Sequence, residues 1–359
     1  MKTILLVSLL LFQHTFAQIL SKKIFPSNFN QTEISIAINP TNPENLIMSC
    51  NGELLPIPPV EGDSPSDDTP KQFNQPCFYT MDGGNTWVDV NGGYAPNNVN
   101  SQGDPVVFYN LFGEAFYITM SESGIMLLKS TESGAVWNEE INIDPLSEDS
   151  DDKPHATADF SGVYINNVYV AWTDFNSTTN GEVVLVKSTD RGETFGSRVP
   201  LFPCSTTVIM GVNLQTGPNG EVYAIAAKYS EIDPNNDFQE KAFVFSKSIN
   251  GGNNFSSPTQ IFTLEGIRTK ILSPDFNLVR VNSWPSMAVD RSNGVRRGWI
   301  YIVYSDKSTG DSDIYLRRSS DGGTTWSNKM LVNSDPSGKQ QWFPSIALDQ
   351  VTGNIYILL

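Results

Sequence analysis

The sequence predicts an all-β protein made of repeated four-stranded antiparallel sheets, and three observations lead to this prediction. The 359 residues include 27 glycines and 22 prolines, which is typical of many short elements joined by turns. One nine-residue turn unit occurs five times, and one apolar pattern that precedes it occurs six times. The two patterns keep the same order along the chain, so one structural unit recurs.

The turn unit places an acidic or amide residue five positions before an aromatic residue. It reads YTMDGGNTW at 79–87, KSTESGAVW at 129–137, KSTDRGETF at 187–195, KSINGGNNF at 247–255 and RSSDGGTTW at 318–326. The carboxylate or amide oxygen accepts hydrogen bonds from the following backbone N–H groups, and glycine supplies the positive φ of the turn. The closing aromatic is expected to fill the wedge between one sheet and the next. The residues given this structural role are Asp82, Trp87, Glu132, Trp137, Asp190, Phe195, Asn250, Phe255, Asp321 and Trp326.

Three apolar runs precede each turn. The first reads EISIAINP at 33–40, GDPVVFYN at 103–110, KPHATADF at 153–160, TTVIMGVN at 206–213, WPSMAVDR at 284–291 and FPSIALDQ at 343–350. The second and third runs, such as NNVYVAWTD and EVVLVKS, have the β-branched and aromatic content of buried strands. Each repeat therefore reads strand, strand, strand, turn, strand, over about 50 to 70 residues.

Four-stranded sheets that recur and cannot bury both faces alone are accommodated by radial packing, so the sequence predicts a β-propeller of about six blades. No turn unit follows the sixth pattern. We therefore expect a last blade with two strands of four, which favours a C-terminally truncated chain. The alternative is that residues 19–30 supply a strand that closes the ring.

The turn unit resembles the Asp-box, or BNR repeat, of the sialidase superfamily, and the resemblance extends from about Glu33 to the last residue. Glu132 and Asn250 depart from the aspartate of that motif and should weaken the cap without abolishing it. In the superfamily the Asp-box turns lie at the outer rim, away from the substrate, so the resemblance implies that function lies at the opposite face. The candidate ligand-binding residues of that face are Asp104, Asp152, Lys153, His155, Asp174, Trp284, Asp306 and Trp342.

The resemblance also provides a test for sialidase activity. The family site has three arginines that bind the substrate carboxylate, a tyrosine nucleophile activated by a glutamate, and an aspartate that acts as acid and base. The family's first arginine lies in an Arg-Ile-Pro motif, whereas the corresponding EISIAINP carries none, and no arginine precedes Arg191. Arg198 follows an Asp-box turn and belongs to an outer strand, while Arg268 and Arg280 lie in an insertion between repeats. Lysine replaces a planar guanidinium poorly, so a complete triad is not expected.

Three functions stay open on the sequence. The favoured one is a propeller that binds a glycan or another extracellular ligand at its central face, because tryptophans beside carboxylates suit sugar rings. The second is an exo-acting glycoside hydrolase with a rearranged carboxylate site, and the third is a structural or adhesive module of a larger cell-surface protein. A carboxylate cluster with a raised pKa at the mouth would favour catalysis, whereas exposed Trp284 and Trp342 without such a cluster would favour binding alone.

The composition and the N-terminal residues restrict the expected binding partners and the cellular location. Residues 1–17 combine a lysine, an apolar run and a small residue in the manner of a secretory signal peptide, which leaves 18–359 as the propeller and predicts a secreted or cell-surface protein. No later apolar run has the length of a membrane span. The net charge of −16 disfavours nucleic acid as a partner, because polyanions repel each other. No organic cofactor is expected.

The sequence gives weaker indications for a metal site and for a disulfide. The acidic loops at 61–68 and 147–152 carry oxygen ligands suited to calcium, but neither has EF-hand spacing and solvated loops are the simpler interpretation. A zinc site is disfavoured because His155 is the sole histidine after residue 17. Cys50 and Cys77 bracket one long loop and are the favoured disulfide pair, with Cys204 left free, and the alternative is three ordinary buried cysteines.

Overall fold

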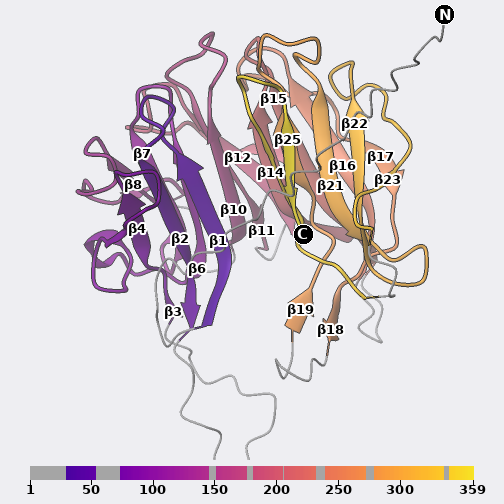
Figure 1. Cartoon of the computed structure of the whole chain (residues 1–359), viewed down its shortest axis with the longest axis horizontal. Coiled ribbons are helices and arrows are strands. Elements are labelled where there is room, and N and C mark those ends of the chain that lie inside the picture. The colour runs from indigo at the N-terminus through magenta and orange to yellow at the C-terminus, as the bar shows by residue number, and fades with distance from the viewer. Residues whose placement is uncertain are drawn as a thin grey trace, which may run out of the picture.

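The computed structural model describes residues 30–53, 73–144, 151–175, 181–204, 206–231, 239–271, 279–334 and 339–359. Within these ranges the protein is an all-β propeller whose sheets stand side by side in chain order around a common centre (Figure 1). Five blades have four consecutive antiparallel strands, and a sixth sheet has two. The predicted fold class, with an incomplete last blade, is therefore confirmed. The predicted signal peptide and the loop at 61–68 lie outside the described residues.

The blades, numbered I to VI, follow the order of the repeats. Blade I contains β1 (Asn30–Ile38), β2 (Leu46–Glu53), β4 (Cys77–Thr80) and β5 (Val88–Asp89), with β3 (Phe73–Asn74) paired to β2. Blade II contains β6 (Gly103–Tyr109), β7 (Ala115–Ser121), β8 (Gly124–Ser130) and β9 (Ile141–Asn142). Blade III contains β10 (Asp151–Ala158), β11 (Val168–Asp174), β12 (Glu182–Ser188) and β13 (Val199–Phe202).

The second half of the chain repeats this plan. Blade IV contains β14 (Thr207–Thr216), β15 (Val222–Glu231), β16 (Glu240–Ser248) and β17 (Thr259–Thr263). Blade V contains β20 (Ser286–Val289), β21 (Ile300–Asp306), β22 (Asp313–Ser319) and β23 (Met330–Leu331), and blade VI contains β24 (Ser345–Leu348) and β25 (Ile355–Leu358). Besides β3, two additions break the regularity: the hairpin β18 (Thr269–Ile271) and β19 (Val279–Val281) between blades IV and V, and a 3-10 turn, η1 (Pro96–Asn98).

The hydrophobic core is divided into the wedges between successive blades. Each of the five core clusters draws its side chains from two neighbouring sheets. Four of the Asp-box aromatics pack into these clusters, each between its own blade and the preceding one: Trp137, Phe195, Phe255 and Trp326. The wedge-filling role predicted from the repeat is thus observed in four of the five copies.

The Asp-box carboxylates cap their own turns. Oδ1 of Asp82 accepts the backbone N–H of Thr86 at 2.8 Å, and Oδ2 accepts its hydroxyl at 2.6 Å. Asp190 and Asp321 make the same pair of bonds to Thr194 and Thr325. Hydrogen bonds to the ionised form lower the pKa of Asp82 and of Asp321 to about 2, with the threonine hydroxyl contributing most. These three residues therefore have a complete structural explanation.

The two departures from the motif behave differently. Oδ1 of Asn250 accepts the N–H of Asn254 at 3.1 Å, so the amide keeps the cap. Among the described contacts, the longer carboxylate of Glu132 accepts no such bond, and its turn is closed by Ser130 Oγ, which accepts the N–H groups of Glu132 and Gly134. The expectation that Glu132 would weaken the cap without abolishing it is therefore wrong: the side-chain cap is lost, while Ser130 retains the turn.

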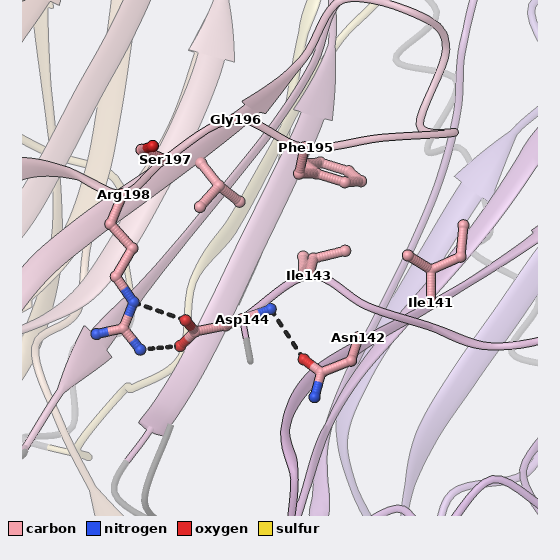
Figure 2. A pocket seen from close by; sticks show the side chains of 9 residues that line it. Ile141, Asn142, Ile143, Asp144, Phe195, Gly196, Ser197 and Arg198 are labelled. Carbon is pink, nitrogen blue, oxygen red and sulfur yellow. Dashed lines mark hydrogen bonds and ion pairs between the residues drawn. The ribbon is translucent and has the colours of Figure 1, made fainter. Parts of the chain in front are cut away.

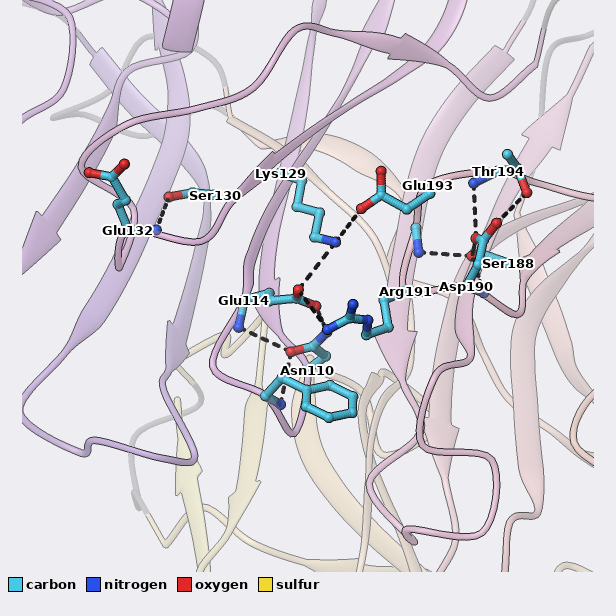
Figure 3. Close-up of polar contacts among 12 residues, drawn as sticks. Asn110, Glu114, Lys129, Ser130, Glu132, Ser188, Asp190, Arg191, Glu193 and Thr194 are labelled. Carbon is cyan, nitrogen blue, oxygen red and sulfur yellow. Dashed lines mark hydrogen bonds and ion pairs between the residues drawn. The ribbon is translucent and has the colours of Figure 1, made fainter.

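Lysines at the first position of the turn unit connect consecutive blades. Lys129 of blade II donates to Glu193 in the turn of blade III at 2.6 Å, and it also lies 3.3 Å from Glu114 (Figure 3). In the same direction around the ring, Lys187 donates to Asn253 at 2.6 Å and Lys247 to the Gly322 carbonyl at 2.8 Å. One repeated lysine therefore holds three successive turns in place.

The predicted disulfide is absent, because all three cysteines are free. Cys77 is paired across the sheet with Ser49, and Cys50 is the next residue of that strand. Adjacent residues of a strand point to opposite faces, so the side chains of Cys50 and Cys77 lie on opposite sides of blade I. Both are buried, as in the alternative interpretation, whereas Cys204 is half-buried.

An apolar face is open on each side of the incomplete part of the ring. On β1 the side chains of Ile34, Ile36 and Ile38 are exposed, and on β25 those of Tyr356 and Leu358 are exposed. Exposed apolar residues at every second position of a strand mark a sheet face with no covering layer. These two faces are called here the open faces. In contrast, the wedges between successive blades from I to V are filled by the core clusters.

Candidate functional site

The innermost strands carry a repeated bulge near their start, and its residues face the centre of the ring. Register shifts mark it in β1, β6, β10 and β14. Left-handed φ values are rare outside glycine and concentrate where function requires them. The bulge residues, called here the hub positions, are Glu33 (φ 54°), Asp104 (53°), Lys153 (53°), Gly211 (70°) and Phe343 (56°), with Trp284 at the equivalent place in blade V.

Charged side chains from the first three blades meet at these hub positions. The ammonium of Lys153 pairs with the Glu33 carboxylate and lies 3.8 Å from Oδ1 of Asp104. Asn51 of β2 orients Asp104: its Oδ1 accepts the backbone N–H of Asp104 at 2.9 Å, and its Nδ2 donates to the carboxylate at 3.2 Å. Asp104 is also hydrogen-bonded to Glu33 and to Asp152. We call Glu33, Asp104, Asp152 and Lys153 the hub cluster.

The three carboxyl groups of the hub cluster have shifted pKa values. Burial, followed by the hydrogen bond to Asp104, raises the pKa of Glu33 to about 7. Burial and the negative charge of Asp104 raise the pKa of Asp152 to about 7 as well. Burial acts against ionisation of Asp104 too, but hydrogen bonds from Glu33 and Asn51 and the Lys153 charge outweigh it and lower its pKa. Near neutral pH the cluster therefore combines an ionised Asp104 with two carboxyl groups whose pKa is about 7.

An indole ring borders the hub cluster. The Lys153 ammonium lies 5.4 Å from the centroid of the Trp284 ring, so the indole borders the hub cluster. Trp284 Nε1 donates to the Tyr229 hydroxyl at 2.7 Å, and the indole itself is half-buried. Phe343 at the hub position of blade VI is exposed, and the adjacent Trp342 is half-buried. Trp284 of blade V therefore borders the carboxyl groups that blades I to III bring to the hub.

Four of the eight candidates from the sequence come together in this way: Asp104, Asp152, Lys153 and Trp284. His155 accepts the backbone N–H of Leu214 through Nδ1 at 3.2 Å and so joins blade III to blade IV. Burial and the nearby Lys153 charge lower the pKa of His155 to about 4, which keeps it neutral as an acceptor. Asp174 and Asp306 form ion pairs with Arg198 and Lys329 at 2.7 and 3.6 Å instead of joining the hub cluster.

A separate pocket lies between blades II and III, outside the hub. It is lined by Ile141, Ile143 and Phe195 on one side and closed by the ion pair of Arg198 with Asp144 (Figure 2). Arg198 Nε donates to Asp144 at 2.6 Å, and the guanidinium also binds Asp174. The positive charge of Arg198 is therefore paired with two carboxylates of the fold. Arg198 immediately precedes the outer strand β13, which agrees with the sequence interpretation that it lies after the Asp-box turn and outside the hub.

The described residues do not form a three-arginine site. The guanidinium of Arg268 approaches the hub, with Cζ 5.6 Å from the centroid of the Tyr229 ring. Other arginine side chains described in the structure bind partners away from the hub: Arg191 binds Glu114, Arg291 the Thr216 carbonyl, Arg296 the Gly353 carbonyl, Arg297 the Pro218 carbonyl and Arg317 the Ser327 carbonyl. The side chain of Arg280 lies outside the described residues.

Five residues of the site were not predicted from the sequence: Glu33, Asn51, Gly211, Tyr229 and Phe343. Three of them had a usable signal, because Glu33, Gly211 and Phe343 occupy the same column of the repeat as Asp104 and Lys153. The contacts of Asn51 and Tyr229 depend on side-chain directions across a sheet and carry no periodic signal. No group of acidic, histidine or cysteine side chains suited to a metal ion occurs among the described residues.

The structure is similar to solved propellers over nearly its whole length. A protein of unknown function from Dyadobacter fermentans is 15% identical with a TM-score of 0.56, over 92% of this chain and 93% of that one. An α-L-arabinofuranosidase of Fusarium graminearum in complex with an iminosugar inhibitor is 15% identical with a TM-score of 0.56, over 90% and 87%. The leech intramolecular trans-sialidase with 2,7-anhydro-Neu5Ac is 10% identical with a TM-score of 0.60, over 95% and 67%.

No protein-family model matches the sequence, and no curated protein does. At such low identities the structural likeness establishes the fold alone. The chain therefore has the β-propeller fold of these structures, and it has turns with side-chain caps of the kind seen at Asp82. Within the described ranges, no helix has the length and apolarity to cross a bilayer.

Proposed function

We propose that this protein is a glycoside hydrolase whose chemistry is carried by the hub cluster. The supporting observation is the hydrogen-bonded series Glu33, Asp104 and Asp152, in which the two outer carboxyl groups have their pKa raised to about 7. Glycosidases need one carboxylic acid that gives a proton and one carboxylate that receives one, and a raised pKa is what keeps the acid protonated near neutrality. The hub cluster supplies both forms.

The contacts suggest which group has which role. Glu33 is paired with the Lys153 ammonium, which favours its ionised form, so it acts as the base. Asp152 has its pKa raised by burial and by the charge of Asp104, so it acts as the acid. Asp152 gives its proton to the glycosidic oxygen as the bond to the anomeric carbon breaks, and Glu33 takes a proton from the attacking water. Asp104, bonded to both, returns that proton to Asp152.

The charge of the site limits the substrate. The cluster contains three carboxyl groups and one lysine, and its strands bring no arginine to the hub. A sugar with a carboxylate at the reacting position would meet like charge there, and Arg268 alone does not make the three-arginine site that binds such a group. We therefore propose a neutral glycan as the substrate. α-L-Arabinofuranosides come first for assay, because an arabinofuranosidase shares the fold.

The test uses purified protein and a panel of p-nitrophenyl glycosides, headed by the α-L-arabinofuranoside, beside a fluorogenic sialoside. The sialoside is expected to stay intact. For a cleaved member of the panel, Asp152→Asn should lower turnover by about 10²- to 10⁴-fold. The loss should be smaller with a dinitrophenyl leaving group, which departs without protonation. Equal losses on both leaving groups would remove Asp152 from the acid role.

A second function is favoured by one observation. Lys153 occupies the centre of the cluster and binds Glu33 while lying close to Asp104, so the carboxylates already have an internal cation. A site neutralised in this way could bind a glycan without cleaving it. A glycan array that reports binding, together with no turnover of any panel member, would support this function over hydrolysis.

A further inference from the structure

Trp284 is seated on a gap left by a glycine of the neighbouring blade. A Cβ placed on Gly211 would lie 2.3 Å from Cγ of Trp284 and 2.6 Å from both Cδ1 and Cδ2. No real Cβ approaches an indole so closely, so any side chain at Gly211 would displace the ring. The other hub positions of the described blades carry side chains, and glycine stands at this position where the indole needs the space.

Hydrogen bonds fix the orientation of the same ring. The Tyr229 hydroxyl, which accepts Trp284 Nε1, lies 3.4 Å from Oε1 of the buried Glu240. Glu240 is itself held by two backbone donors, the N–H groups of Ser283 and Arg268, each at 3.2 Å. Ser283 immediately precedes Trp284, so one buried carboxylate positions both the backbone and, through Tyr229, the edge of the indole.

These contacts make the indole rigid while leaving it accessible at the mouth. The ring rests on the backbone of Gly211, its N–H is bonded, and it is half-buried beside the hub cluster. A surface that is already ordered loses little conformational entropy when a ligand packs on it. Aromatic rings pack against the C–H faces of sugars, because both are apolar and flat.

We propose that Trp284 is the stacking platform for a sugar ring bound at the hub, and that Gly211 is the residue that positions it. The ligand is a glycan whose ring presents a C–H face to the indole and whose hydroxyl groups point to the hub cluster. This inference rests on the proposed function in requiring a glycan ligand. It goes further because it assigns binding of the sugar ring to residues of blades IV and V, and bond cleavage to residues of blades I to III.

The test compares two glycine substitutions that impose the same backbone strain. Gly211→Ala adds a Cβ against the indole, whereas Gly92→Ala adds one at a similar φ of 62° with nothing within 4 Å. Both should lower the melting temperature through backbone strain, and Gly211→Ala should lower it further because it also displaces the indole. On a glycan array, Gly92→Ala should keep the wild-type signals, and Gly211→Ala and Trp284→Ala should lose them. Wild-type signals retained by Gly211→Ala would overturn the proposal.

A double-mutant cycle separates a positioning role from general destabilisation. For the array glycan with the strongest signal, calorimetric titration should give a dissociation constant raised about tenfold or more by Gly211→Ala. In the Trp284→Ala background the same change should have no further effect, because Gly211 acts through the indole alone. An additive loss would contradict the proposal. A wild-type protein that neither binds any array glycan nor cleaves any panel glycoside would refute the proposed function together with this inference, whereas binding that survives Trp284→Ala would refute this inference alone.

Discussion

Lys129 and Glu193 belong to different blades and form an ion pair with a separation of 2.6 Å between Nζ and Oε1. The lysine side chain is almost wholly buried, and its other partner, Glu114, is buried too. Replacing the lysine would leave Glu114 with Arg191 and Asn110 as its remaining partners. The contact therefore connects two repeats through a charge that the fold has removed from water.

We predict that Lys129→Met lowers the free energy of unfolding by about 2–3 kcal/mol, because it leaves a buried carboxylate without its ammonium partner. Lys187→Met should cost less, about 1 kcal/mol, since Lys187 binds neutral acceptors in Asn253 and Gly251. Urea unfolding followed by far-UV circular dichroism measures both. Lys339→Met, at an exposed position, is the control with no expected change. Equal losses for all three would contradict the inter-blade role.

The Asp-box caps predict the acid side of the stability profile. The pKa of Asp82, Asp190 and Asp321 in the folded protein is about 2, below the ordinary aspartate value. Because the folded-state pKa is the lower one, the caps contribute stability above about pH 4 that is lost as pH falls towards 2. A triple Asp→Asn variant should show a flatter decline of stability between pH 4 and 2 than the parent. Identical profiles would show that other carboxyl groups control acid unfolding.

The uncapped turn of blade II should be repairable. Glu132→Asp combined with Val136→Thr restores the residues that make the Asp82–Thr86 bonds in blade I. We expect the double variant to be more stable by about 0.5–1 kcal/mol, the net value of a typical hydrogen bond. Thermal unfolding by calorimetry measures the change. The reverse substitution, Asp190→Glu, should destabilise blade III, and a stabilised Asp190→Glu variant would contradict the capping explanation.

The open faces should bind apolar dyes. Ile34, Ile36 and Ile38 form a continuous exposed row on β1, so the folded protein should enhance the fluorescence of anilinonaphthalene sulfonate. Ile36→Lys should reduce that signal. Ile249→Lys should not, because Ile249 is exposed alone on an Asp-box turn. A signal unaffected by Ile36→Lys would place the dye elsewhere.

The hub cluster predicts the pH dependence of the proposed hydrolysis. Asp152 must hold its proton to act as the acid, and its pKa is raised to about 7. Turnover should therefore fall as pH rises through about 7, and the acid limb should depend on Glu33, which must be ionised to act as the base. Initial rates on a cleaved p-nitrophenyl glycoside between pH 4 and 9 measure both limbs. A rate that keeps rising above pH 8 would be inconsistent with an acid of this pKa.

The fold was predictable because its signals are local. The cap at Asp82 and the wedge position of Trp137 follow from nine consecutive residues, and five repetitions make the inference firm. The site was only half predictable. Asp104 and Lys153 were identified from strand position, but Glu33 meets Lys153 across 120 residues of sequence, and that contact depends on the closure of the ring. Asp174 was predicted as a binding residue from its strand position, but its carboxylate pairs with Arg198, and the sequence gives no sign of that contact.

The lysines at the first position of the turn unit all donate in the same direction around the ring. Each blade from II to IV therefore brings a donor for its successor, and each blade from III to V brings an acceptor for its predecessor. A duplicated repeat within this series would carry a lysine donor for the next blade and an acceptor for the lysine of the preceding blade. Changes in blade number by whole repeats would thus leave the seams between blades chemically intact, so the ring can be lengthened or shortened without redesign of its contacts.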